Sequence, residues 1–94
     1  MPNEHFNLSN EFLEAVANSK LLATRPDNDT LLQLYALYKQ ATEGDAPEKG
    51  TYGMFDIKEK LKHEAWLKYK GVSSDEAQAQ YISLVNQLSN NNTI

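Results

Sequence analysis

The chain has 94 residues, 40% of them hydrophobic, and a formal net charge of −4 at pH 7. This length gives one domain, residues 1–94, whose single core buries only about 60–65% of the extended surface. The acidic balance argues against general nucleic-acid binding, the lack of cysteine excludes disulfides and thiolate metal sites, and no apolar run is long enough to span a membrane. The first five residues lack the basic start and apolar stretch of a secretory signal, so we expect a cytoplasmic protein.

The hydrophobic pattern is helical along the whole chain. A first helix is predicted from Ser9 to Lys20, with Ser9 as N-cap and an inner stripe formed by Leu8, Phe12, Ala15 and Val16. After a break at Arg25-Pro26-Asp27, a second helix is predicted over 28–43, capped by Asp27 or Asn28 and ended by Gly44. Its apolar face comprises Leu31, Leu34, Tyr35, Tyr38 and Ala41.

A loop over 44–55 follows, and its length predicts a connection that crosses the domain. The third helix is predicted over 56–70, with Asp56 as N-cap and Gly71 as the residue that ends it. The spacing assigns its inner face to Ile57, Leu61, Ala65 (or Glu64) and Lys68, with Trp66 and Tyr69 beside it.

The fourth helix has the clearest signals. Ser73 and Glu76 form a capping-box pattern, and the residues after it make a regular apolar stripe: Ala77, Tyr81, Leu84, Val85 and Leu88. The ends, about 1–8 and 89–94, are expected to be flexible. Four helices with one long connection predict a small all-α four-helix bundle.

The chain lacks the residue patterns of the common catalytic sites. His5 and His63 lie far apart, no cysteine is present, and neither a nucleophile elbow, a paired zinc-binding histidine motif nor a phosphate-binding glycine loop occurs. We therefore expect no enzyme activity, no metal and no cofactor. The features favour binding.

One short segment carries the strongest indication of a ligand. Tyr35 and Tyr38 lie three residues apart on one helical face, and Lys39 follows directly. Two flat aromatic surfaces beside a cation suit a ligand that combines a flat ring with an anionic group. Five lysines against three acids between Asp56 and Lys70 add a local balance of +2, although such a run is more often only a solvated helix face.

This segment resembles the signature of the acyl-CoA-binding protein family. The resemblance rests on Tyr38-Lys39-Gln40-Ala41-Thr42 followed by Gly44-Asp45, and it continues through Gly53-Met54-Phe55-Asp56-Ile57-Lys58, Ala65-Trp66, Lys70-Gly71 and Tyr81-Ile82. It covers the chain from about Phe12 to Leu88. It implies an up-down-down-up bundle with a long loop between helices two and three. It also implies non-catalytic binding, transport and buffering of medium- to long-chain acyl-CoA.

The resemblance also assigns roles to individual residues. Lys39 matches the lysine that pairs with the ribose 3′-phosphate, Lys62 matches a second phosphate lysine, and Tyr35, Tyr38 and Tyr81 match ligand-contacting tyrosines. The weaker candidates are Lys20 and Arg25 for a positive rim, and Phe12, Leu31, Leu32 and Met54 for an apolar trough. Each tyrosine has an alternative interpretation as an ordinary core aromatic, and each lysine as a solvated charge.

Three positions depart from the family pattern. His63 stands where a tryptophan is common, Leu37 where a histidine is frequent, and the loop over 44–53 is about one residue longer than usual. We expect binding to survive these changes, while the shape of the groove and the preferred chain length depend on them.

A different class of function stays open at this stage. The bundle also fits a protein-interaction module whose groove holds an acidic or amphipathic helical peptide. A hydrolase or transferase would require a nucleophile and a base that the sequence does not supply. We expect a monomer that makes transient contact with acyl-CoA-using enzymes or membrane surfaces.

Overall fold

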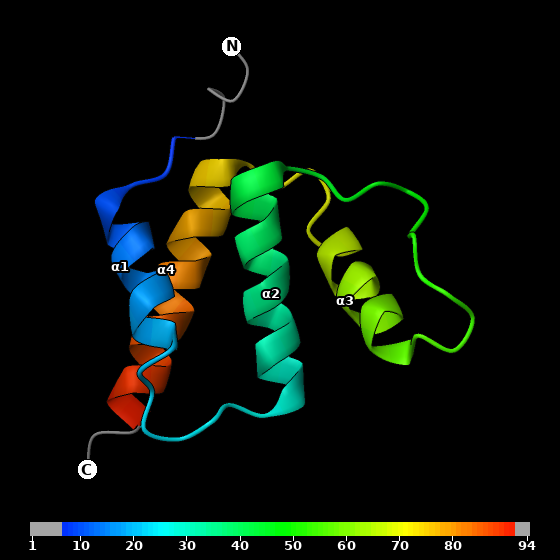
Figure 1. Cartoon of the computed structure of the whole chain (residues 1–94). Helices are drawn as coiled ribbons and strands as arrows, with labels where there is room; N and C mark the ends of the chain where they lie inside the picture. Colours follow the sequence, from blue (N-terminus) through cyan, green and yellow to red (C-terminus); the bar gives the residue numbers. More distant parts are fainter. Residues whose placement is uncertain (1–6, 92–94) are drawn as a thin grey trace.

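The computed structural model describes residues 7–91, and all regular structure in that range is helical (Figure 1). The helices are α1 (Asn10–Ser19), α2 (Asn28–Glu43), α3 (Ile57–Leu67) and α4 (Ser74–Asn91). In Figure 1, α1 and α4 run in one direction while α2 and α3 run in the other. The predicted all-α, up-down-down-up arrangement is therefore confirmed.

The helices form a row rather than a closed bundle. Among the described residues, backbones come close between α1 and α4, between α4 and α2, and between α2 and α3. The molecule accordingly measures 42 × 37 × 17 Å along its principal axes. Because α2 lies inside the row, its side chains meet neighbours on two sides.

Three predicted caps are formed by short polar side chains. The hydroxyl of Ser9 accepts the Phe12 N–H at 3.0 Å, the carboxylate of Asp27 accepts the Thr30 N–H at 2.8 Å, and the hydroxyl of Ser73 accepts the Glu76 N–H at 3.1 Å. Each bond satisfies an orphan donor of the first helical turn. Asp56 occupies the N-cap position of α3 as predicted, but its side chain makes no capping hydrogen bond, and its ψ of 70° differs from the extended values of 158° at Ser9 and 170° at Asp27.

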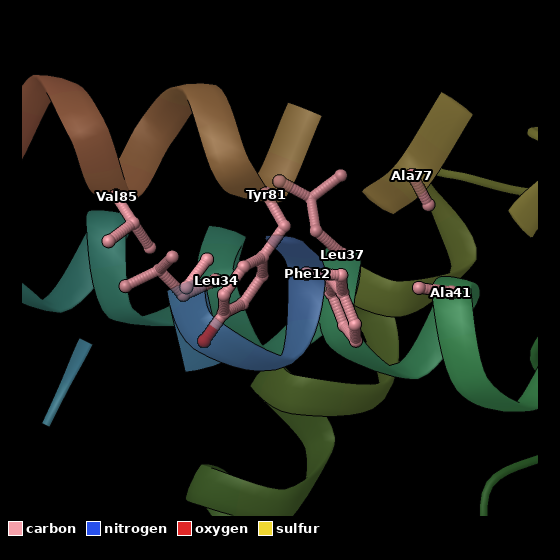
Figure 2. Packing of buried hydrophobic residues seen from close by; sticks show 8 residues of the cluster. Phe12, Leu34, Leu37, Ala41, Ala77, Tyr81 and Val85 are labelled. Atoms are coloured by element: carbon pink, nitrogen blue, oxygen red, sulfur yellow. The ribbon is translucent and has the colours of Figure 1, made fainter. Parts of the chain in front are cut away.

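The main core lies where α1 and α2 pack against α4. Phe12, Leu37 and Val85 are fully enclosed, and Tyr81 is 4% exposed. Figure 2 shows this cluster from close by, with contributions from Phe12, Leu34, Leu37, Ala41, Ala77, Tyr81 and Val85. The inner stripes predicted for the first and fourth helices are confirmed, except that Leu8 is 37% exposed.

The predicted inner face of the third helix is wrong. Ile57 is 61% exposed and Leu61 45%, and Lys68 is also exposed, whereas α3 buries His63, Ala65 and Trp66. The reason is that Trp66 packs with Ala36 of α2 and with Ala46 of the preceding loop in a second, smaller core cluster. The rings of His63 and Trp66 therefore face inward. The aliphatic side chains of Ile57 and Leu61 remain at the surface.

Hydrogen bonds tie the 44–56 loop across the end of α2 and onto α3, as its length predicted. The Trp66 indole N–H donates to the Gly44 carbonyl at 2.8 Å, and His63 Nε2 lies 2.7 Å from the Pro47 carbonyl oxygen. Asp45 Oδ1 accepts from the Gly71 N–H and the Gln40 amide, both at 2.8 Å, and these two bonds lower the pKa of the Asp45 carboxyl. The first part of the loop, residues 44–47, is thus held against α2, α3 and the turn before α4.

Two predicted helix ends differ from the structure. The third helix ends at Leu67, and a tight turn then leads to Gly71, whose φ of 88° is the left-handed conformation expected of that glycine. The fourth helix continues to Asn91, two residues past the point where the flexible end was expected to begin. Residues 1–6 and 92–94 lie outside the described range.

Candidate ligand-binding site

The first hollow of the site lies between α1 and α2, with Tyr81 of α4 also in its lining; we call it the α1–α2 hollow. It has a volume of about 490 Å³. Its lining comprises Val16, Ser19, Lys20, Leu31, Leu34, Tyr35, Tyr38 and Tyr81. The lining is mostly apolar, with one lysine and three phenol groups, which suits a flat, partly polar ring.

The tyrosines of this hollow are held by the core beneath them. The Phe12 ring stacks under Tyr38 with centroids 6.1 Å apart and meets Tyr81 edge-on at 5.2 Å. Tyr38 remains 40% exposed, so one face of its ring is available to a ligand. The Tyr81 hydroxyl donates to Ser19 Oγ at 3.2 Å; burial raises the pKa of Tyr81, and the bond to Ser19 only partly opposes this.

The second hollow lies between α2 and α3; we call it the α2–α3 hollow. It has a volume of about 310 Å³. Its lining comprises Arg25, Asn28, Leu31, Leu32, Tyr35, Lys58, Leu61 and Lys62. The lining combines three leucines with three cations. This combination of apolar surface and positive charge suits an amphiphile with an anionic end.

Two lysines stand over aromatic rings at the junction of α2 and α3. Lys62 Nζ lies 4.7 Å from the centroid of the Tyr35 ring, and Lys39 Nζ lies 4.9 Å from that of Trp66. Each position allows a cation–π attraction. The Lys62 ammonium of α3 therefore lies over a ring of α2, and the Lys39 ammonium of α2 lies over a ring of α3.

Each of these lysines also has an acidic neighbour on its own helix. Lys39 pairs with Glu43 one turn on, and Lys62 Nζ lies 3.4 Å from Glu59 Oε2. Exposed pairs of this kind contribute about 0–1 kcal/mol. Either lysine can therefore turn to a stronger anion, such as a phosphate, at little cost.

Tyr35 joins the separate parts of the site. It lines both hollows and also a third one of about 130 Å³ under the 44–56 loop, which we call the loop hollow. Tyr52, His63 and Trp66 form the aromatic wall of the loop hollow. Sequence reasoning missed this third hollow, because Tyr52 and His63 meet only through the folded loop, with ring centroids 5.7 Å apart.

The structure gathers most of the predicted site residues on one face of α2. Those that line the hollows or stand over their rings are Tyr35, Tyr38, Lys39, Lys62, Tyr81, Lys20, Arg25, Leu31 and Leu32. Two others are placed elsewhere. Phe12 is 0% exposed in the core, and Met54 is 86% exposed, and neither lines the three hollows. Phe12 thus supports the tyrosines from below instead of forming an open trough.

Two further properties of the described residues bear on the type of site. Within 7–91, no three histidine, cysteine or acidic side chains gather into a group that could hold a metal ion. None of the helices in the same range combines the length and hydropathy needed to cross a bilayer.

Comparison with known proteins decides the family. Residues 9–85 match the family model described as acyl CoA binding protein. The chain belongs to the acyl-CoA-binding protein family. The expectation drawn from the tyrosine–lysine signature is therefore confirmed, and the match spans all the residues that line the hollows.

Relatives in this acyl-CoA-binding protein family cover most of the chain. An acyl-CoA-binding protein homolog of Caenorhabditis elegans is 49% identical over 77 residues, which are 82% of this chain and 88% of that protein. The acyl-CoA-binding protein of Saccharomyces cerevisiae is 52% identical over 67 residues, covering 71% and 76%.

Solved structures of the family have the same fold. The crystal structure of an acyl-CoA-binding protein from Oryza sativa superposes with a TM-score of 0.78 at 41% identity, covering 86% of this chain and 89% of the other. The solution structure of the yeast protein gives 0.71 at 44% identity, covering 93% and 100%. The row of four helices is thus the acyl-CoA-binding protein fold.

Proposed function

We propose that this protein binds medium- to long-chain acyl-CoA esters without catalysis and carries and buffers them in the cytoplasm. The observation that carries the proposal is the junction at Tyr35, which lines two hollows of different chemistry, with the Lys62 ammonium over its ring and Lys39 one helical turn further along α2. Acyl-CoA has the matching form, since it joins a polyanionic nucleotide to an apolar tail.

The nucleotide end fits the α1–α2 hollow. An adenine ring packs against the exposed face of Tyr38, and base–aromatic stacking of this kind is worth about 1–3 kcal/mol. Lys20 lies at the same hollow and adds positive charge there. The phosphates then lie near Tyr35, where Lys39 and Lys62 supply point charges and the Tyr35 hydroxyl can donate a hydrogen bond.

The acyl tail fits the α2–α3 hollow. Leu31, Leu32 and Leu61 remove it from water, and each buried methylene contributes about 0.8 kcal/mol. Affinity should therefore rise with chain length until the hollow is filled. Arg25 and Lys58 lie at the margin of the hollow and favour the anionic end of the ligand over an uncharged lipid.

A carrier must bind its ligand as an intact thioester and then release it. The protein would deliver acyl-CoA by transient contact with membranes or with enzymes that use it. It works as a monomer in this proposal, because the apolar stripes of α1, α2 and α4 are occupied by their shared core.

Isothermal titration of the delipidated protein with palmitoyl-CoA tests the proposal, with CoA and palmitate as controls. We expect tight one-to-one binding of the thioester and much weaker binding of each half alone, because the two hollows then contribute to one ligand. Steady hydrolysis of the thioester during the titration would contradict a purely binding role.

The opposite outcome favours the other class of function. If palmitoyl-CoA produces neither heat nor a thermal shift, the carrier is excluded, and an amphipathic acidic peptide becomes the ligand to titrate.

A further inference from the structure

Large apolar side chains are exposed just before and at the start of α3. Met54 is 86% exposed, Phe55 90% and Ile57 61%. Leu61, one turn further along the helix, is 45% exposed and lines the α2–α3 hollow. Exposure of these apolar side chains to water contributes nothing to the stability of the protein. The cluster therefore indicates a contact with an apolar partner.

The positive charge on this side of the molecule belongs to α3 as a whole, because within residues 54–60 Lys58 and Lys60 are matched in number by Asp56 and Glu59. Lys58 and Lys60 are exposed and have no ion-pair partner among the described residues, whereas the nearby Glu59 is paired with Lys62. The stretch from Asp56 to Lys70 carries a balance of +2 in a chain whose net charge is −4. The molecule is therefore polarised, and an anionic surface would attract the side that carries α3 and repel the rest.

The cluster also lies at an extreme of the molecule. In Figure 1, α3 stands at the end of the row opposite α1, and the loop that leads into it projects beyond the bundle. Met54, Phe55 and Ile57 belong to neither hydrophobic core cluster. A large partner can thus cover this edge without disturbing the core.

We propose that this edge, residues 54–60, docks the protein onto an anionic lipid bilayer. Met54, Phe55 and Ile57 enter the boundary between headgroups and acyl chains, while Lys58 and Lys60 contact lipid phosphates. Apolar side chains beside lysines are the combination that binds anionic interfaces.

The shape of the surface favours a bilayer over a protein. The apolar side chains project from a loop and one helical turn, whereas a specific protein interface requires a complementary pocket for each anchor. A bilayer imposes no such fit. Docking also brings the mouth of the α2–α3 hollow to the membrane through Leu61 and Lys58, so that an acyl tail could enter from the lipid; this consequence, unlike docking itself, rests on the proposed function.

Flotation of the full chain with vesicles tests the docking. We expect the protein to float with vesicles of phosphatidylcholine mixed with phosphatidylserine, but not with phosphatidylcholine alone, and we expect high salt to release it. Met54→Ser combined with Phe55→Ser, and separately Lys58→Glu combined with Lys60→Glu, should each lower the bound fraction at least several-fold.

A matched control is available at a distant site. Leu21, in the turn after α1, is 78% exposed, and Leu21→Ser should leave vesicle binding unchanged. Phe55→Trp adds a direct readout: its fluorescence should shift to the blue with anionic vesicles, whereas that of Leu21→Trp should not. An equal loss of binding in Leu21→Ser would overturn the proposal.

The failures of the two proposals can be told apart. If the parent protein does not float with anionic vesicles, while Met54→Ser with Phe55→Ser weakens acyl-CoA binding in solution, the edge covers the bound tail; docking is then wrong and the carrier function stands. If the parent protein floats but binds no acyl-CoA, docking stands and the carrier function falls.

Discussion

Tyr35 is the residue on which the candidate site depends most, because it lines all three hollows and lies beneath the Lys62 ammonium. The sequence could predict Tyr35, Tyr38 and Lys39 together, because their spacing puts them on one stretch of helical surface. The contact between Lys62 and Tyr35 joins two helices, so no local pattern reveals it. Before the fold was known, only the family resemblance assigned Lys62 to the site.

Substitution of Lys39 tests its proposed contact with phosphate. Lys39→Ala should weaken palmitoyl-CoA binding by about 1.5–3 kcal/mol, the range for a hydrogen bond to a charged group, which is a roughly 10- to 150-fold rise in Kd. Removal of the 3′-phosphate from the ligand should weaken binding to the parent protein but add little to the loss in the variant.

A second lysine provides the control for this cycle. Lys49→Ala removes an exposed lysine of the loop that has no ion-pair partner in the described range, and its titration should match that of the parent. Strictly additive losses in the cycle would show that Lys39 and the 3′-phosphate do not meet.

The buried phenol of Tyr81 gives an expectation at high pH. Burial raises the pKa of Tyr81 above the ordinary value of 10.0, so its neutral form is favoured in the folded state. The resulting stability is complete below the pKa of an unfolded tyrosine and is lost as pH rises through the folded value.

We therefore expect the free energy of unfolding to fall above about pH 10 and to fall less steeply in Tyr81→Phe. The ultraviolet absorbance of phenolate can be followed against pH in the parent protein and in Tyr81→Phe. The comparison should show that the variant lacks a tyrosine whose pKa is raised. Ionisation of Tyr81 at the pH of a free tyrosine would contradict the expected effect of burial.

At the scale of elements, the sequence predicted every helix, because periodicity and caps are local properties. It failed in part on the inner face of α2, where Leu37 is buried and the predicted Tyr38 is 40% exposed, and it failed on the face of α3. There the apolar spacing of Ile57 and Leu61 was outweighed by the hydrogen bonds of Trp66 to Gly44 and of His63 to Pro47. Both bonds reach the loop more than a dozen residues upstream, so no local pattern reveals them.

The cap of α4 offers a direct test of a predicted local interaction. Ser73→Ala removes the acceptor of the Glu76 N–H and should lower the free energy of unfolding by about 1 kcal/mol, as is typical of capping residues. Urea unfolding followed by circular dichroism measures the change. Ser83→Ala, an exposed serine within the same helix, should be neutral or slightly stabilising, and an equal loss there would exclude capping as the cause.

At the scale of the whole molecule, the row of helices explains how so small a chain can hold a large ligand. In a closed four-helix bundle, the other helices would cover this face of α2. Here one face of α2 stays open between α1 and α3, and the two larger hollows of the site lie along it. The up-down-down-up order followed from the family resemblance. Neither composition nor periodicity predicts the flat shape of the molecule, because the shape depends on which pairs of helices pack together and which do not.

An open site of this kind links ligand binding to global stability. At a free palmitoyl-CoA concentration one hundred times Kd, the folded state should gain about 2.7 kcal/mol. For a domain of this size, the gain corresponds to a rise in Tm on the order of 10 °C. Differential scanning fluorimetry measures it, and an acidic amphipathic peptide at the same concentration should give no shift; the reverse pattern would support the interaction module.

The position of Lys39 above the single tryptophan has an optical consequence. Trp66 is the only indole of the chain, and the Lys39 ammonium lies 4.9 Å from its ring centroid. A phosphate that draws Lys39 away removes a positive charge from the face of the chromophore, and the emission of Trp66 should change as it does. We therefore expect Trp66 to serve as a fluorescent reporter of an occupied site, which can be read in a stopped-flow instrument without any label.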